Sequence, residues 1–141
     1  MTTKQQLHEL ADLRLQEAEA LFVADLYDGS VYLCGYVIEL ALKACVCAKL
    51  GVTKYPSEGD QWRQKTFRTH DFEDLSLLAG LESEISLANP ALLQNWSVTT
   101  KWHPERRYQP KGTYKKVDAE KILNAIRAKP DGVLEWLSKH W

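Results

Sequence analysis

A carboxylate and an ammonium group lie inside the most apolar stretch of the chain, residues 35–47 (GYVIELALKACVC). Glu39 and Lys43 are four residues apart, so on a helix they share one face, in the order that favours an ion pair. An unpaired ion is costly to bury, so both groups need a partner or an outlet to water. One interpretation is a structural ion pair joined by Arg14 of the preceding helix, with Lys43 reaching solvent along its aliphatic stem. The other is the floor of a small polar pocket.

The segment WHPERRY places two arginines beside aromatic side chains at residues 102–108. Arg106 and Arg107 could hold a phosphate by bidentate hydrogen bonds while a base stacks on Trp102 or Tyr108. The alternative is an ordinary surface loop that its aromatic residues anchor and its arginines keep solvated. His103 precedes a proline and ranks below His70 as a candidate for chemistry.

His70 opens the helical stretch that begins THDFEDL, where its ring could face the end of a helical bundle. A lone histidine in this place is a cap, a packing residue or a proton carrier. The sequence contains no Gly-rich phosphate loop, no Ser/His/Asp order and no zinc-protease helix. Three cysteines, Cys34, Cys45 and Cys47, lack metal-ligand spacing and are interpreted as buried reduced thiols. We therefore expect no metal and no cofactor.

The spacing of apolar residues predicts the helices that position these groups. They are expected over residues 3–26 and about 31–50, from about 69, over 82–95 with a break at Asn89-Pro90, and from 118 with a split at 129–132. The stretch 27–30 (YDGS) is expected to form the turn of the first helical hairpin, and residues 52–68 and 97–114 to be irregular. The fold class predicted is all-α, an up-and-down bundle of four to five helices forming one domain over residues 1–141.

Helix ends carry recognisable signals. Thr3 with Gln6 fits a capping box, and Gly51 suits the C-terminal cap of the apolar helix. Proline at residues 90 and 130 disfavours an uninterrupted helix through either position.

Composition limits the function classes. The chain of 141 residues is 45% hydrophobic and 26% charged, with a formal net charge of −1. This near-neutral balance argues against a protein that coats nucleic acid without specificity. No run of 18 apolar residues and no apolar signal segment is present, so we expect a cytoplasmic protein with no membrane association.

Three stretches together resemble the HEPN family of small helical-bundle domains from prokaryotic defence, toxin–antitoxin and RNA-processing systems. The first is the hairpin RLQEAEALFVADLYDGSVYLCGYVIELALKA with its Glu-x-x-x-Lys core. The second is THDFEDL, and the third is KWHPERRY followed by a helix ending in VLEWL. The resemblance covers most of the chain, from about Arg14 to Leu137.

The resemblance implies a bundle that usually forms a homodimer. Active members are metal-independent ribonucleases that use an Arg, four to six residues, then a His. Other members are inert partners of a minimal nucleotidyltransferase. Arg63 and His70 have six residues between them and satisfy the spacing by count, but they precede the third expected helix rather than lying at a late one. Arg106 and Arg107 lie in the usual region, yet the next histidine is His140.

The leading hypothesis is a dimeric HEPN-like protein of a defence or toxin–antitoxin type system that binds RNA, a nucleotide or a partner. Its candidate ligand-binding residues are Glu39, Lys43, Arg63, Trp102, Arg106 and Tyr108, and its candidate catalytic residues are His70 and Arg107. One alternative is a toxin-like, metal-independent endoribonuclease. Another is a catalytically inert dimer paired with a minimal nucleotidyltransferase.

Overall fold

The computed structural model describes residues 1–141 and contains helices but no β-sheet. The α-helices are α1 (Lys4–Val23), α2 (Tyr27–Leu50), α3 (Gln61–Phe67), α4 (Phe72–Leu78), α5 (Glu82–Ser86), α6 (Pro90–Thr100), α7 (Lys116–Arg127) and α8 (Val133–Ser138), with the 3₁₀ helix η1 at Pro104–Tyr108. The all-α class is confirmed. The eight α-helices exceed the four to five expected for two reasons. The predicted break before Pro90 and the predicted split at 129–132 each divide one expected helix into two, and α3 lies in a segment predicted to be irregular.

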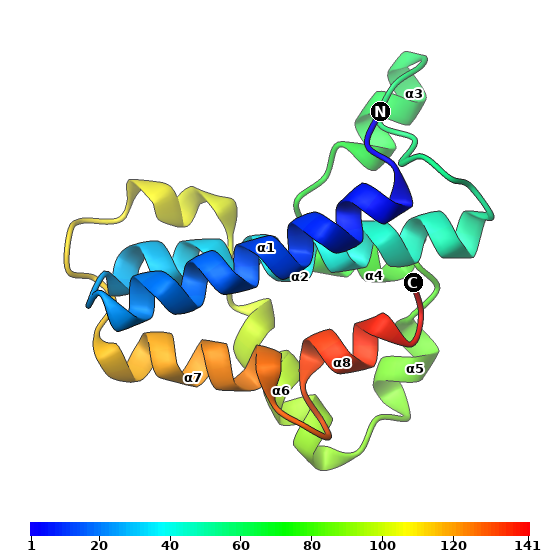
Figure 1. Cartoon of the computed structure of the whole chain (residues 1–141). Coiled ribbons are helices and arrows are strands. Elements are labelled where there is room, and N and C mark those ends of the chain that lie inside the picture. Colours follow the sequence, from blue (N-terminus) through cyan, green and yellow to red (C-terminus); the bar gives the residue numbers. More distant parts are fainter.

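The two longest helices, α1 and α2, pack against each other as the first helical hairpin (Figure 1). Its start is as predicted: Thr3 and Gln6 form the capping box. Its turn is not, because residues 27–30 already belong to α2 and the chain reverses at residues 24–26. There Asp25 adopts a left-handed backbone conformation, with φ of 61°. Aspartate tolerates that conformation better than most residues, so the turn needs no glycine.

Helix α2 is the centre of the hydrophobic core, and it ends as predicted at Gly51 in the left-handed conformation. By length and apolar composition it could cross a membrane, but 67% of its most apolar window is buried inside the fold, as in a core helix. Its three cysteines are free and buried, as predicted, and burial raises the pKa of Cys34 and Cys45 to about 12. These thiols are therefore poor nucleophiles.

Helices α4, α7 and α8 pack on α2, and α6 packs on α7 (Figure 1). The expected inner residues Ile122, Leu123 and Ile126 of α7 are buried, as are Val133 and Leu137 of α8. Helix α6 extends to Thr100, so the prediction of irregular structure from residue 97 was wrong. Asn89 caps α6 with its side chain and Pro90 takes the first position of the helix, where its missing N–H costs nothing.

The connection from α2 to α4 is a long excursion that carries α3 away from the bundle (Figure 1). It was predicted to be irregular, but Asp60 caps a short helix there. Two main-chain hydrogen bonds tie the base of the excursion to the N-terminus, from Lys4 N to Thr53 O and from Tyr55 N to Thr2 O, each 2.8 Å. Helix α3 itself makes no extensive contact with another helix.

The connection from α6 to η1 is fixed by a close approach of Trp102 to Gly35 of α2. A Cβ atom on Gly35 would lie 1.7 Å from Cε2 of the Trp102 ring, so only glycine leaves room for the indole. The indole is 5% exposed and stacks on Phe72, with ring centroids 5.6 Å apart. Gly35 therefore determines where the chain that leads to η1 meets the bundle.

Gly35→Ala tests this packing. Alanine normally stabilises a helix relative to glycine, but here the clash with Trp102 should reverse the sign and lower the free energy of unfolding by about 1–3 kcal/mol. Gly29→Ala is the matched control, because a Cβ there would lie 3.2 Å from the end of the flexible Leu21 side chain. Its effect should stay within about 1 kcal/mol of zero. Urea denaturation measures both, and equal effects of the two substitutions would contradict the proposed role of Gly35.

Candidate functional site

The site is built around Glu39, a residue buried in the middle of α2. Its Oε1 accepts a hydrogen bond from Lys43 Nζ at 2.7 Å and another from His70 Nδ1 at 2.9 Å. The predicted convergence of Glu39, Lys43 and His70 is therefore present in the structure. His70 lies in the segment between α3 and α4, so this contact fastens the long excursion to the core helix.

The proposed partnership with Arg14 was wrong. Arg14 pairs instead with Glu17 on its own helix. The two are three residues apart and partly exposed, so this pair forms without any desolvation of a core charge. His70 takes the place expected for Arg14.

Exposure increases in steps through the three paired groups. The Glu39 side chain is 4% exposed, that of Lys43 is 15% exposed, and that of His70 is 52% exposed. The second carboxylate oxygen, Oε2, is buried and has no hydrogen-bond partner. Because a carboxylate oxygen only accepts, Nδ1 of His70 must carry the hydrogen, which leaves Nε2 of this exposed ring free to accept a proton or a hydrogen bond.

A cleft of about 360 Å³ opens beside this triad. Lys43, Arg68 and His70 contribute its polar side chains that carry or can carry positive charge, and the ring of Tyr55 forms part of the wall. Lys43 Nζ also lies 5.4 Å from the centroid of the Tyr55 ring. No acidic residue lines the cleft, so its surface favours an anion.

Arg68 was not among the predicted site residues. Its side chain donates from Nε to the carbonyl oxygen of Ser57 at 3.2 Å, and the residue lines the cleft. The sequence signal was its position two residues before His70, at the end of a segment rich in basic residues. That signal became decisive only once α3 and the following turn were placed beside α2.

The two arginines of η1 have different environments. Arg106 donates hydrogen bonds to the hydroxyl of Tyr114 and to the carbonyl oxygen of Lys101, so it holds the loop together. Arg107 is exposed and lies 4.8 Å from the centroid of the exposed Tyr108 ring. Of this predicted cluster, Arg107 and Tyr108 are thus available to a ligand, whereas Arg106 is occupied in structure.

Beneath η1 lies a pair of tyrosines on α2. The hydroxyls of Tyr32 and Tyr36 share a hydrogen bond of 3.1 Å, and both rings contact Trp102. Burial, followed by that hydrogen bond, raises the pKa of Tyr36 to about 12, so its hydroxyl stays protonated at neutral pH. Trp102 is buried among these rings, which leaves it no free face for a base.

Asp28, in the first turn of α2, anchors the far end of the same loop. Its carboxylate accepts hydrogen bonds from the main-chain N–H groups of Tyr114 at 2.8 Å and Gly112 at 2.7 Å. These bonds, that of Tyr114 first, hold the pKa of Asp28 below its usual value. Asp28 therefore fastens the loop at residues 112–114 to the start of α2.

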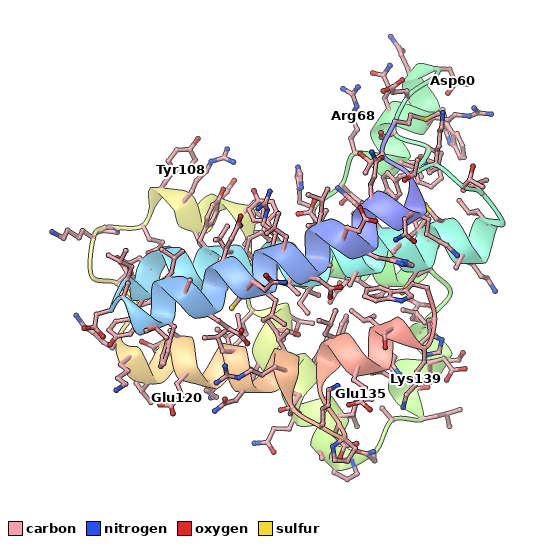
Figure 2. All side chains as sticks on the ribbon, in the orientation of Figure 1. Asp60, Arg68, Tyr108, Glu120, Glu135 and Lys139 are labelled. Atoms are coloured by element: carbon pink, nitrogen blue, oxygen red, sulfur yellow. The ribbon has the colours of Figure 1, made fainter.

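The cleft and η1 lie along one face of α2 but do not form a single pocket. Tyr32, Tyr36, Glu39 and Lys43 succeed one another on that face at helical spacing. In the view of Figure 2, the labelled Arg68 and Tyr108 project from one edge of the molecule, while Glu120 and Glu135 lie at the opposite edge. The buried Trp102 separates the cleft from η1, because its ring contacts Tyr36 on the η1 side and Phe72 of α4.

The remaining predicted residues lie apart from the cleft. Arg63 is exposed on α3 and does not line it. His103 caps η1, where its Nδ1 accepts from the main-chain N–H of Glu105 at 3.3 Å. His140 contacts Trp136 near the C-terminus.

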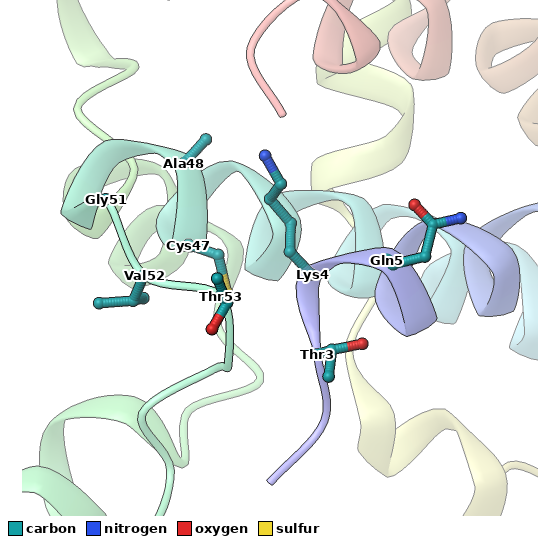
Figure 3. A pocket seen from close by; sticks show the side chains of 8 residues that line it. All are labelled: Thr3, Lys4, Gln5, Cys47, Ala48, Gly51, Val52 and Thr53. Atoms are coloured by element: carbon teal, nitrogen blue, oxygen red, sulfur yellow. The ribbon is translucent and has the colours of Figure 1, made fainter.

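The largest hollow is elsewhere, between the start of α1 and the end of α2 (Figure 3). It measures about 590 Å³ and has one charged lining residue, Lys4. Cys47 also lines it, but burial raises the pKa of that thiol. With neither a cluster of charges nor a reactive thiol, this hollow is a weaker candidate than the cleft beside His70.

A family model described as the HEPN domain matches residues 5–139 of the chain. The chain belongs to the HEPN family. The predicted resemblance is therefore confirmed over nearly the whole sequence. No curated protein and no solved structure matches the chain significantly. Family membership associates this HEPN chain with RNA-related or toxin–antitoxin systems, and the finer assignment depends on the site.

Glu39→Gln tests how strongly the HEPN core depends on the buried carboxylate. The substitution removes the counter-charge of Lys43 and leaves a neutral amide oxygen as the only acceptor for Lys43 and His70, so it should lower the free energy of unfolding by about 1–3 kcal/mol. Amide hydrogen exchange should also quicken in residues 52–71, because one of their attachments to α2 is weakened. Thermal or urea unfolding measures the first effect.

Glu17→Gln is the matched control, since it breaks the partly exposed pair with Arg14. It should cost less than about 1 kcal/mol and leave exchange in residues 52–71 unchanged. If both substitutions lowered the free energy of unfolding equally, Glu39 would contribute no more to stability than a surface ion pair.

Proposed function

We propose that this HEPN protein binds RNA through its phosphodiester backbone at the cleft formed by Lys43, Arg68 and His70. The observation that carries the proposal is the arrangement of two cationic side chains, Lys43 and Arg68, and a histidine that can become cationic around one hollow with no acidic lining residue. Arg68 offers a planar fork that suits a phosphate, and Lys43 adds a charge held in place by Glu39. Arg107 and Tyr108 of η1, which packs on α2, would contact the RNA strand beyond the cleft.

The family supports this choice over a small-molecule function. HEPN domains occur in RNA-related systems, and the basic groups here lie at two places along one helix face rather than in one closed pocket. We propose in addition that the protein is a cytoplasmic homodimer within a defence or toxin–antitoxin type system. A minimal nucleotidyltransferase is the partner class that family membership favours.

Binding of a fluorescently labelled single-stranded RNA, followed by anisotropy, tests the proposal. Arg68→Ala and His70→Ala should each weaken binding about three- to tenfold, because each removes a charged or polar contact to phosphate. Removing Arg68 should also reduce the slope of log K against log salt by about 0.7. Arg107→Ala should weaken binding less, and Lys121→Ala, on the exposed face of α7, should have no effect.

Two results would contradict this function. One is no binding of RNA or of millimolar nucleotide by the folded protein. The other is binding that Arg68→Ala and Arg107→Ala leave unchanged. The first result would favour the inert interaction protein, in which Glu39 and its partners serve stability and assembly alone. The second would mean that RNA binds at another surface of the protein.

A second candidate function is metal-independent RNA cleavage, and the orientation of His70 favours it. In such a reaction the ribose 2′-oxygen attacks the adjacent phosphorus and the bond to the 5′-oxygen breaks. A 2′,3′-cyclic phosphate forms, and the departing 5′-oxygen takes a proton from water to leave as a 5′-hydroxyl. Nε2 of His70 is free to accept the proton of the 2′-hydroxyl, and Glu39 would stabilise the resulting imidazolium through Nδ1. Arg68 or Arg107 would stabilise the charge on the phosphate oxygens.

Incubation with total RNA in the presence of a chelator tests this candidate. His70→Ala should reduce the cleavage rate by about 10²-fold or more, as expected for loss of a general base. His103→Ala is the control, because this exposed histidine caps η1 outside the cleft. A substrate with 2′-deoxyribose should resist cleavage. Cleavage that survives His70→Ala, or that stops on addition of the chelator, would exclude the mechanism.

A further inference from the structure

Helix α3 is basic, aromatic and exposed. Between Asp60 and Asp71 the chain carries Arg63, Lys65 and Arg68 and no acidic residue. Trp62, at the second position of α3, is 68% exposed although tryptophan is among the side chains most costly to leave in water. Neither the cleft nor the packing of the bundle accounts for this residue.

The exposed indole of Trp62 packs against a buried aromatic ring at its base. The Trp62 ring meets the buried Phe67 ring edge-on, with centroids 6.4 Å apart at 87°. Phe67 in turn meets the buried Tyr55 ring at 5.9 Å and 86°, and the Tyr55 hydroxyl donates to the Phe67 carbonyl oxygen at 2.8 Å. The contact with Phe67 thus packs Trp62 against buried rings while most of its surface stays exposed.

The same rings connect α3 to the cleft. Tyr55 and Phe67 line the cleft, and Lys43 Nζ lies over the Tyr55 ring. Arg68 follows Phe67 directly and lines the cleft as well. In Figure 2, Asp60 and Arg68 mark the two ends of α3, which stands away from the helices of the bundle. A chain of contacts thus leads from the outermost aromatic ring to the positive groups beside His70.

We propose that α3 is an arm that binds single-stranded RNA, with an unpaired base stacked on Trp62 and the phosphates beside Arg63 and Lys65. This inference rests on the RNA-binding function proposed for the cleft, and extends it by specifying the form of the RNA. A tryptophan face accepts a base only when that base is unstacked from its neighbours, so the arm selects single strands over duplex. Charge favours RNA over a protein partner, because Arg63 and Lys65 follow Trp62 on α3 and no residue within the helix is acidic.

The test compares Trp62→Ala, Trp62→Phe and wild type for binding of a short oligouridylate and of a duplex of the same length. Trp62→Ala should weaken binding of the single strand about tenfold, which corresponds to the loss of one stacked base. Trp62→Phe should retain most of the affinity because phenylalanine also stacks. Leu87→Ala, which alters another highly exposed apolar residue, is the matched control and should change nothing.

Tryptophan fluorescence gives a readout that a purely structural role would not affect. Oligouridylate should quench the emission of wild type, and Trp62→Phe should lose most of that quenching while it still binds. The double substitution Arg63→Glu/Lys65→Glu should also weaken oligouridylate binding relative to wild type, whereas Lys121→Glu on α7 should have little effect.

The outcomes separate the two proposals. If Arg68→Ala weakens binding but Trp62→Ala does not, the cleft function stands and the arm is excluded. Equal affinity for duplex and single strand would also exclude the arm. If the wild-type protein binds neither RNA, both proposals fail together. Weaker binding by Trp62→Ala with rescue by Trp62→Phe and loss of quenching would support the arm.

Discussion

Glu39 is a buried carboxylate, and such a group must be compensated wherever the chain can supply positive charge or hydrogen-bond donors. One partner, Lys43, comes from the next turn of α2, so no other segment has to be brought to Glu39 for this contact. The other, His70, comes from a segment 31 residues away in the sequence. This second contact makes the excursion between α2 and α4 return to the core at a defined place. The position of Arg68, the depth of the cleft and the base of the α3 arm all depend on that return.

A second constraint acts one turn earlier on the same helix. Gly35 has no side chain, so the Trp102 indole lies directly on the backbone of α2 and stacks on Phe72. Phe72 begins α4, two residues after His70, so the two connections are packed against each other as well as against α2. A missing side chain and a buried charge together bring both irregular segments of the chain to one face of one helix.

The sequence supports some of these conclusions better than others. Helix periodicity identified α1 and α2, and the pair of Glu39 and Lys43 followed from their spacing alone, because local geometry determines both. The second partner of Glu39 did not follow, since Arg14 and His70 were both eligible until the distant segment was placed. The turn at Asp25 was missed for a related reason: YDGS is a strong turn signal, but Asp28 is used there to hold residues 112–114 and the helix simply begins earlier. Tertiary contacts decided each of these cases.

The structural and functional interpretations of Glu39 are compatible. If Glu39 served stability alone, its partners would be expected to be as buried as the carboxylate. Apolar residues in place of the pair would often stabilise the core as well or better. Instead exposure rises from Glu39 to Lys43 to His70, so the buried charge is connected to solvent through donors that line an open cleft. A carboxylate at the closed end of such a series fixes the positions of the groups at its open end and sets which nitrogen of the histidine faces outward. The same contacts that stabilise the core therefore hold this polar surface in one geometry, as the proposed RNA-binding site would require.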